Sequence, residues 1–158
     1  LDIVMWLAKR FYPPTEDTRG SNSVALCRAC SNGHLDVAQW LTAYYDFTDA
    51  DIRADDNLLS IVCQEGHLAV AQWLTERFAL TRADAISGNN RAFRHSCING
   101  RLEVVKWLVD KFCLTADDVE AVIEDWRPLL SSKLVHWLAK RFKLNFNLCP
   151  DESDEDEN

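Results

Sequence analysis

The sequence predicts an all-α solenoid in which antiparallel helix pairs stack side by side. Three closely related strings begin at Gly33, Gly66 and Gly100 and end in Trp-Leu. Five of the six tryptophans precede a Leu, at spacings of 34, 33, 34 and 30 residues; they are Trp6, Trp40, Trp73, Trp107 and Trp137. A repeat of this length indicates stacked supersecondary units. Five glycines and four prolines in 158 residues are fewer than a tight-turned β-sandwich usually needs.

The segment after each Gly is predicted to form the second helix of a unit. In the unit that begins at Gly66, apolar residues follow at the helical spacing i, i+3, i+4 and i+8, namely Val70, Trp73, Leu74 and Phe78. The same spacing at residues 3–11 and 134–142 gives five such helices in all. Because the tryptophans share this apolar spacing, we expect their column to lie in the interior.

A shorter first helix is predicted upstream of each Gly. Its apolar residues recur by column, as Leu26, Leu59 and Phe93 illustrate. Between the helix pairs run polar connectors at 48–51, 81–84 and 115–118, whose Thr and Asp side chains hydrogen-bond their own backbone in turns. The run Gly88-Asn-Asn is a further turn signal.

At these residues the chain resembles an ankyrin array, and Gly-His-Leu-x-Val is the signature of that family's second helix. The resemblance implies an ankyrin-type solenoid. The family's Thr-Pro-Leu-His run at the first helix is absent, so we expect longer or less regular loops between pairs. The Trp-Leu pairs and the connectors are similar to divergent arrays of protists and large DNA viruses. A tetratricopeptide array has a comparable period, but its small-residue pattern is missing.

The predicted solenoid covers residues 1–149, as a fragment of a longer array. It has a partial first repeat at 1–12, full repeats at about 22–47, 55–80 and 89–114, and a degenerate, capping repeat at 117–146. Residues 150–158 are predicted to be a disordered acidic tail. Six of the 25 acidic residues lie there, so that the rest of the chain holds 19 acidic and 17 basic residues although the net charge is -8.

Charge and motif content exclude several classes of function. A body without a basic stripe argues against nucleic-acid binding and against anionic membranes. No apolar stretch is long enough to span a bilayer. Neither nucleotide-binding glycine motifs nor catalytic or zinc-protease spacings are present. We therefore expect a monomeric, non-enzymatic protein that needs no cofactor and no metal, in the cytoplasm of the cell.

The cysteines and histidines allow a chemical and a structural interpretation. Cys27 and Cys30 form a C-x-x-C pair, which is compatible with zinc or redox chemistry. Cys30 also shares one repeat column with Cys63 and Cys97, which favours reduced core cysteines in a reducing compartment. His34 and His67 likewise recur at one position, where we expect them to bond backbone groups at the turn between the helices.

The resemblance implies that partner contacts come from the concave face and the loops. The two residues before each Gly differ between units while their neighbours repeat, and arginines of the connectors suit carboxylates on a protein surface. The predicted partner-binding residues are Ser31, Asn32, Arg53, Asp55, Asp56, Gln64, Glu65, Arg82, Asn89, Arg91, Arg94, Ile98 and Asn99. The predicted function is a non-catalytic scaffold that binds another protein, and the alternative is an architectural spacer between domains.

Overall fold

The computed structural model describes residues 6, 10, 16–54, 58–126 and 129–144, with side chains at all of these except 16–22, 54, 121, 125 and 126. The predicted partial repeat at 1–12 lies outside the described residues apart from Trp6 and Arg10, and the acidic tail lies entirely outside them.

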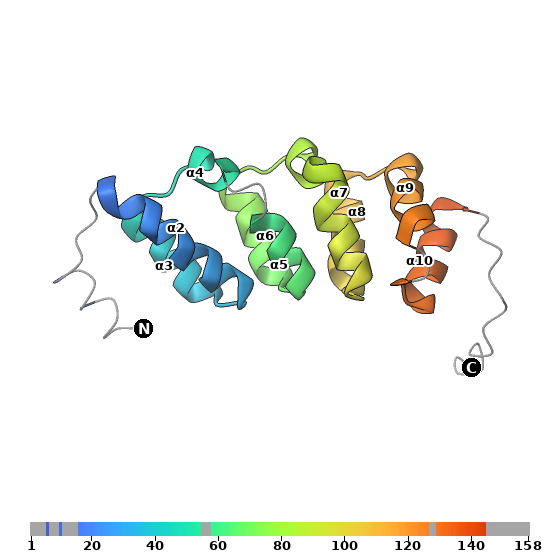
Figure 1. The fold of residues 1–158 in the computed structure, drawn as a ribbon, viewed down its shortest axis with the longest axis horizontal. Coiled ribbons are helices and arrows are strands. Elements are labelled where there is room, and N and C mark those ends of the chain that lie inside the picture. The colour runs from blue at the N-terminus through green and yellow to red at the C-terminus, as the bar shows by residue number, and fades with distance from the viewer. Residues whose placement is uncertain (1–5, 7–9, 11–15, 55–57, 127–128, 145–158) are drawn as a thin grey trace.

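The described residues form a row of helix pairs (Figure 1). The first helix of each pair is α2 (Glu16–Ser31), α5 (Leu58–Glu65), the second part of α7 (Arg82–Ile98) and α9 (Ala116–Trp126). The second helices are α3 (Leu35–Tyr45), α6 (Leu68–Arg77), α8 (Leu102–Phe112) and α10 (Ser132–Phe142). The first helices pack on one another along the row, α2 on α5, α5 on α7 and α7 on α9. This is the predicted all-α solenoid.

One continuous core follows the repeat columns through the described part of the chain. Leu26 and Phe93 are almost fully buried in the first helices, and Leu74 and Leu108 are buried in the second helices. The cysteine column also belongs to this core: Cys30, Cys63 and Cys97 are free thiols with no exposed surface. The predicted core position of that column is therefore confirmed.

The tryptophan column corrects our prediction of an interior position. Trp40, Trp73 and Trp107 are half-buried and pack against the edge of the core, as Trp137 does. Trp40 stacks on Tyr44, and Trp73 meets Phe78 edge to face, with ring centroids 5.1 and 6.0 Å apart. The core and a neighbouring ring therefore cover most of each indole, and an edge of it stays accessible.

Each second helix ends in a left-handed residue that is not Gly. These residues are Asp46, Ala79, Cys113 and Lys143, with φ between 43° and 56°. The apolar residue that follows returns its N–H to the helix, as Leu114 does to the carbonyl of Val109 at 3.1 Å. This closure is the Schellman arrangement, in which a buried apolar residue after the turn anchors the helix end.

Candidate functional site

Neighbouring helix pairs contact each other at the connectors and, at the opposite end, at the Gly turns. Each connector begins with a Thr that hydrogen-bonds to an Asp three residues later. The backbone N–H and the hydroxyl of Thr81 both donate to Asp84 Oδ2, at 2.7 and 2.8 Å. The same two bonds run from Thr48 to Asp51 and from Thr115 to Asp118. Such boxes satisfy donors at a helix start. The connectors are therefore helical where we predicted irregular loops, and α4 (Asp49–Ala54) is one of them.

The connector of the third unit also contains the predicted turn. Residues 87–90 of α7 leave the helical conformation, and Gly88, Asn89 and Asn90 all have φ near 60°. Asn90 then donates from Nδ2 to the carbonyl of Asp118 in the next unit, at 3.1 Å. The turn therefore separates the connector from the first helix and contributes a contact between units.

Two arginines join one connector to the next. Arg53 donates from Nε to Asp84 Oδ1 at 3.1 Å, and its Nη2 lies 3.3 and 3.2 Å from the carbonyl oxygens of Phe78 and Ala79. Arg82 donates from Nη2 to Asp118 Oδ2. We predicted that both arginines contact a partner, but in the structure their guanidinium groups bind the neighbouring unit.

These contacts keep the two aspartates ionised. Partial burial disfavours the charged form of Asp84, but hydrogen bonds from Thr81 and Arg53, with the charge of Arg53, outweigh it and hold its pKa below the usual value. Asp118 has a lowered pKa for the same reasons, with Thr115 and Arg82 as its partners. Asp84 and Asp118 therefore each serve both the helix start and the contact between units.

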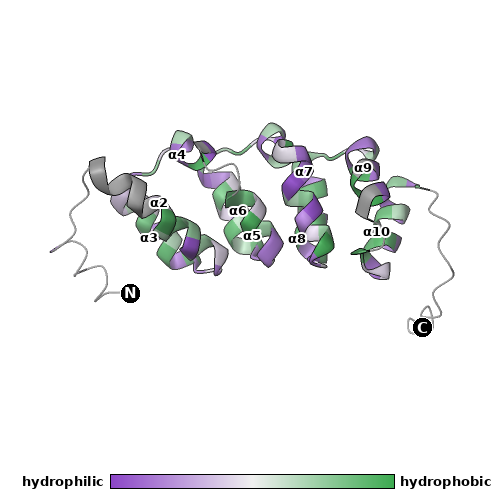
Figure 2. Cartoon of the chain, viewed as in Figure 1, coloured by the Kyte–Doolittle hydropathy of each residue, from purple (hydrophilic) through white to green (hydrophobic). Residues whose placement is uncertain are grey.

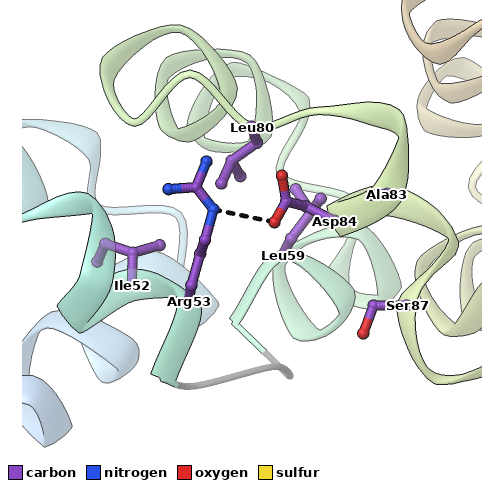
Figure 3. A pocket seen from close by; sticks show the side chains of 7 residues that line it. All are labelled: Ile52, Arg53, Leu59, Leu80, Ala83, Asp84 and Ser87. Atoms are coloured by element: carbon purple, nitrogen blue, oxygen red, sulfur yellow. Dashed lines mark hydrogen bonds and ion pairs between the residues drawn. The ribbon is translucent and has the colours of Figure 1, made fainter.

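A cavity of about 180 Å³ lies beside the Arg53–Asp84 ion pair (Figure 3). Figure 3 shows the Arg53 and Asp84 side chains pointing toward each other. Its lining comprises Ile52, Arg53, Leu59, Leu80, Ala83, Asp84 and Ser87. Small-molecule sites usually measure about 300 to 1,000 Å³. A space of this size, with its two charged side chains already paired to each other, is small for a substrate site.

At the opposite end of the pairs, the turns at Gly33 and Gly66 each place a side chain of the following unit on their backbone. Gly33 has φ +75°, and a Cβ built on it would lie 2.6 Å from Nδ1 of His67. A Cβ on Gly66 would lie 2.8 Å from Cδ of Arg101, whose Nε donates to the carbonyl of Gln64 at 3.0 Å. His34 and His67 make no side-chain capping bond to their helices. His67 thus contributes by packing on Gly33, without the predicted bond at its helix start, and the equivalent His34 is exposed.

The predicted partner-binding residues outside the connectors line one side of the first helices. We call this surface the first-helix face and define it by the accessible side chains Val24, Cys27, Arg28, Ser31, Asn32, Ile61, Gln64, Glu65, Arg91, Arg94, His95, Ile98 and Asn99. Asn32 and Asn99 each donate from Nδ2 to the carbonyl four residues earlier, at 2.8 Å. Asn89 is exposed in the turn of α7, and Asp55 and Asp56 lie outside the described residues.

Five residues of this face were not among the predicted partner-binding residues: Val24, Cys27, Arg28, Ile61 and His95. Val24 and Ile61 are large apolar residues with 54% and 36% of their surface exposed. Arg28, Ile61 and His95 occupy one column, five residues before each Gly. The signal was available, because this column changes its chemistry from unit to unit as the two positions before Gly do.

The first-helix face carries more positive than negative charge among its described residues. Burial lowers the pKa of His95, and the nearby guanidinium groups of Arg94 and Arg91 lower it further. The face carries one carboxylate, that of Glu65, which accepts a bond from Gln64 Nε2 at 3.2 Å. Figure 2 shows hydrophilic residues predominating on the visible side of α7. A largely neutral imidazole thus lies among cations on a surface that also exposes apolar side chains.

Other kinds of site find no support in the described part of the chain. Among those residues, no group of three or more His, Cys, Asp or Glu side chains is placed to hold a metal ion. In the same residues, no helix combines the length and the apolar character that crossing a bilayer requires.

Comparison with known proteins identifies the repeat. A family model described as ankyrin repeats (3 copies) matches residues 26–121, which is more than half of the chain. The comparison with curated proteins gives no match, and neither does the comparison with solved structures. Ankyrin repeats are generally protein–protein interaction modules without catalytic activity. The helix pairs, the Gly turns and the family match together show that this chain belongs to the ankyrin repeat family.

Proposed function

We propose that this chain is a non-catalytic scaffold that binds a partner protein through the first-helix face. The main support for this proposal is that one repeat column is buried and constant, whereas another is accessible and varies between units. The position three residues before each Gly holds a buried Cys in three units, whereas the position five residues before it holds Arg28, Ile61 and His95. Buried columns stabilise the array in every unit, so the columns that differ are those available for recognition.

The composition of the face supports this role. Exposed Val24 and Ile61 supply apolar area, and three arginines lie on the same surface. Contacts of protein interfaces are enriched in Arg and in apolar anchors surrounded by polar groups. We place the scaffold in the cytoplasm, because the free thiols of its core column suit a reducing compartment. We propose further that it acts as a monomer.

Affinity capture tests the proposal. The full chain is immobilised and exposed to an extract of its own cells, beside a variant that carries Arg91→Glu and Arg94→Glu. A second variant, Arg77→Glu with Lys111→Glu, makes the same charge change on exposed residues of the second helices. Circular dichroism checks that all three are folded. We expect a protein that is retained by the wild type and the control and lost with the face variant. Equal retention by all three would refute the choice of face.

A second candidate, an architectural spacer, is favoured by the contacts between connectors. The pairs Arg53–Asp84 and Arg82–Asp118 tie consecutive units together and suit a stiff array. If neither the wild type nor the control retains a protein, the spacer becomes the better proposal. A spacer requires domains on both sides, so the spacer proposal would then be tested by searching the open reading frame for flanking domains.

A further inference from the structure

The first-helix face presents different chemistry at equivalent positions of three consecutive units. In the column five residues before each Gly, Arg28 is exposed on α2, Ile61 on α5, and His95 is half-buried on α7. Because α5 packs against both α2 and α7, the apolar side chain lies between the other two. The order along the row is therefore cation, apolar residue, then imidazole.

Further cations lie at the α7 end of this column. Arg91 and Arg94 are half-buried and close enough to His95 to disfavour its protonation. The whole chain has a net charge of -8, so average composition does not explain a positive patch. The positive patch is therefore local to the first-helix face, where it lies on the same surface as the exposed Ile61.

The dimensions set the size of the segment that fits. Neighbouring packed helices lie about 8 to 10 Å apart, so the column spans about 16 to 20 Å over three units. An extended chain covers about 3.3 Å per residue, which corresponds to about six residues. A segment of that length can place one side chain on Ile61 and carboxylates on either side of it.

We propose that the first-helix face binds an acidic segment of the partner protein, whose single central apolar side chain packs on Ile61 while carboxylates on either side pair with Arg28 and with Arg91 and Arg94. This inference rests on the proposed function and specifies the partner. Arg binds carboxylates in a bidentate manner, which gives such pairing its specificity. A nucleic acid fits less well, because the column has an exposed aliphatic residue at its centre.

The chain's own acidic run is a poorer occupant. Residues 151–157 are Asp-Glu-Ser-Asp-Glu-Asp-Glu, with no apolar residue among the acids. This run lacks the side chain that the exposed Ile61 requires, whereas a partner segment can supply both components.

Peptide binding tests the proposal. A labelled peptide of about twelve residues with a Leu between two acidic runs, long enough for the column, is titrated with the full chain at neutral pH and followed by fluorescence anisotropy. Matched peptides replace the Leu by Ser or the acids by Lys, and a single-stranded oligonucleotide serves as the nucleic-acid probe. The protein variants are Arg91→Glu with Arg94→Glu, Ile61→Ser, and the control Arg77→Glu with Lys111→Glu.

We expect the double charge reversal to weaken binding by about tenfold or more and Ile61→Ser by about threefold, with the control within about twofold of wild type. The bound carboxylates also raise the pKa of His95, because an opposite charge favours the imidazolium; a ring-proton NMR titration with and without peptide measures this. Equal binding by the face and control variants, no binding of the acidic peptide, or tighter binding of the oligonucleotide would overturn the proposal. If capture from extract still depends on Arg91 and Arg94 in that case, the interaction function stands and only the acidic partner fails.

Discussion

The two ends of the helix pairs hold the array together in different ways. At the turns of Gly33 and Gly66, the following unit packs a side chain on the backbone, as His67 does on Gly33. Along the connector edge, which runs across the top of Figure 1, the units meet through ion pairs such as Arg53–Asp84. A Cβ added at Gly33 would overlap the His67 ring, which must then move, whereas a solvent-accessible ion pair adapts its geometry and is worth less. The Gly end therefore sets the position of neighbouring units more strictly than the connector end does.

The largest expected effect comes from adding one methyl group at the Gly end. Gly33→Ala places a Cβ against the His67 ring and puts Ala at φ +75°. We expect a loss of about 2 to 4 kcal/mol in the free energy of unfolding, from left-handed strain and overpacking together. Urea denaturation followed by circular dichroism measures it.

Gly100→Ala is the matched control for this substitution. Gly100 has φ +65°, but nothing lies within 4 Å of its Cβ position. Gly100→Ala should therefore lower the free energy of unfolding only by the left-handed strain, about 1 to 2 kcal/mol. Equal losses at the two positions would show that packing between units adds nothing at the Gly turn.

A smaller loss in the free energy of unfolding is expected when the connector carboxylate Asp84 is removed. Asp84→Ala removes both bonds from Thr81 and the partner of Arg53. Loss of a helix cap costs about 1 kcal/mol, and the ion pair adds up to about 1 kcal/mol. Urea denaturation at neutral pH gives the value, and a loss as large as that of Gly33→Ala would contradict the comparison.

Acid should reproduce part of the Asp84→Ala loss. Asp84 and Asp118 have lowered pKa values in the folded chain, so the stabilisation they provide is complete above the unfolded-state pKa of about 3.9 and is lost as the pH falls through the folded values. Urea midpoints measured as a function of pH should therefore fall less steeply in acid for Asp84→Ala than for wild type. Parallel slopes would mean that this carboxylate is not specifically stabilised by folding.

Removing the arginine alone should cost less than removing its carboxylate. Arg53→Ala leaves the Thr81–Asp84 box intact and loses the contact between units, at about 1 kcal/mol or less. Salt should weaken the wild type toward the variant, because exposed ion pairs are screened. A thermal denaturation series in NaCl tests this, and a difference that does not change with salt would argue for packing by the Arg stem instead.

The smallest predicted change is a gain in stability. Cys113 ends α8 at φ 49°, and its side chain is exposed. Cys113→Gly relieves the left-handed strain but increases the freedom of the unfolded chain, for a net gain of about 0.5 kcal/mol. Thermal melting under reducing conditions measures it. A lower melting temperature would show that the thiol, 3.8 Å from the carbonyl of Asp110, contributes more than the strain costs.

The sequence predicts the repeated features of the fold but not all contacts between the units. Helix pairs, Gly turns and the cysteine column were predictable because each depends on residues that recur at fixed spacing. The roles of Arg53 and Arg82 were not predictable, because the two arginines occupy different positions in their units. They reach equivalent aspartates only when the units stack. Ile61, by contrast, was predictable, because its column differs between units as the two positions before each Gly do.

The buried cysteine column gives each of three units its own chemical reporter of motion. Burial raises the pKa of the Cys30 thiol to about 12, with a smaller contribution from Cys27, and burial alone raises the pKa values of Cys63 and Cys97. A thiol reacts as the thiolate and only when accessible, so alkylation of each column residue must wait until its own unit opens. The rates of modification at Cys30, Cys63 and Cys97, read separately by mass spectrometry against the exposed Cys113, would rank the units by how often they separate from the stack.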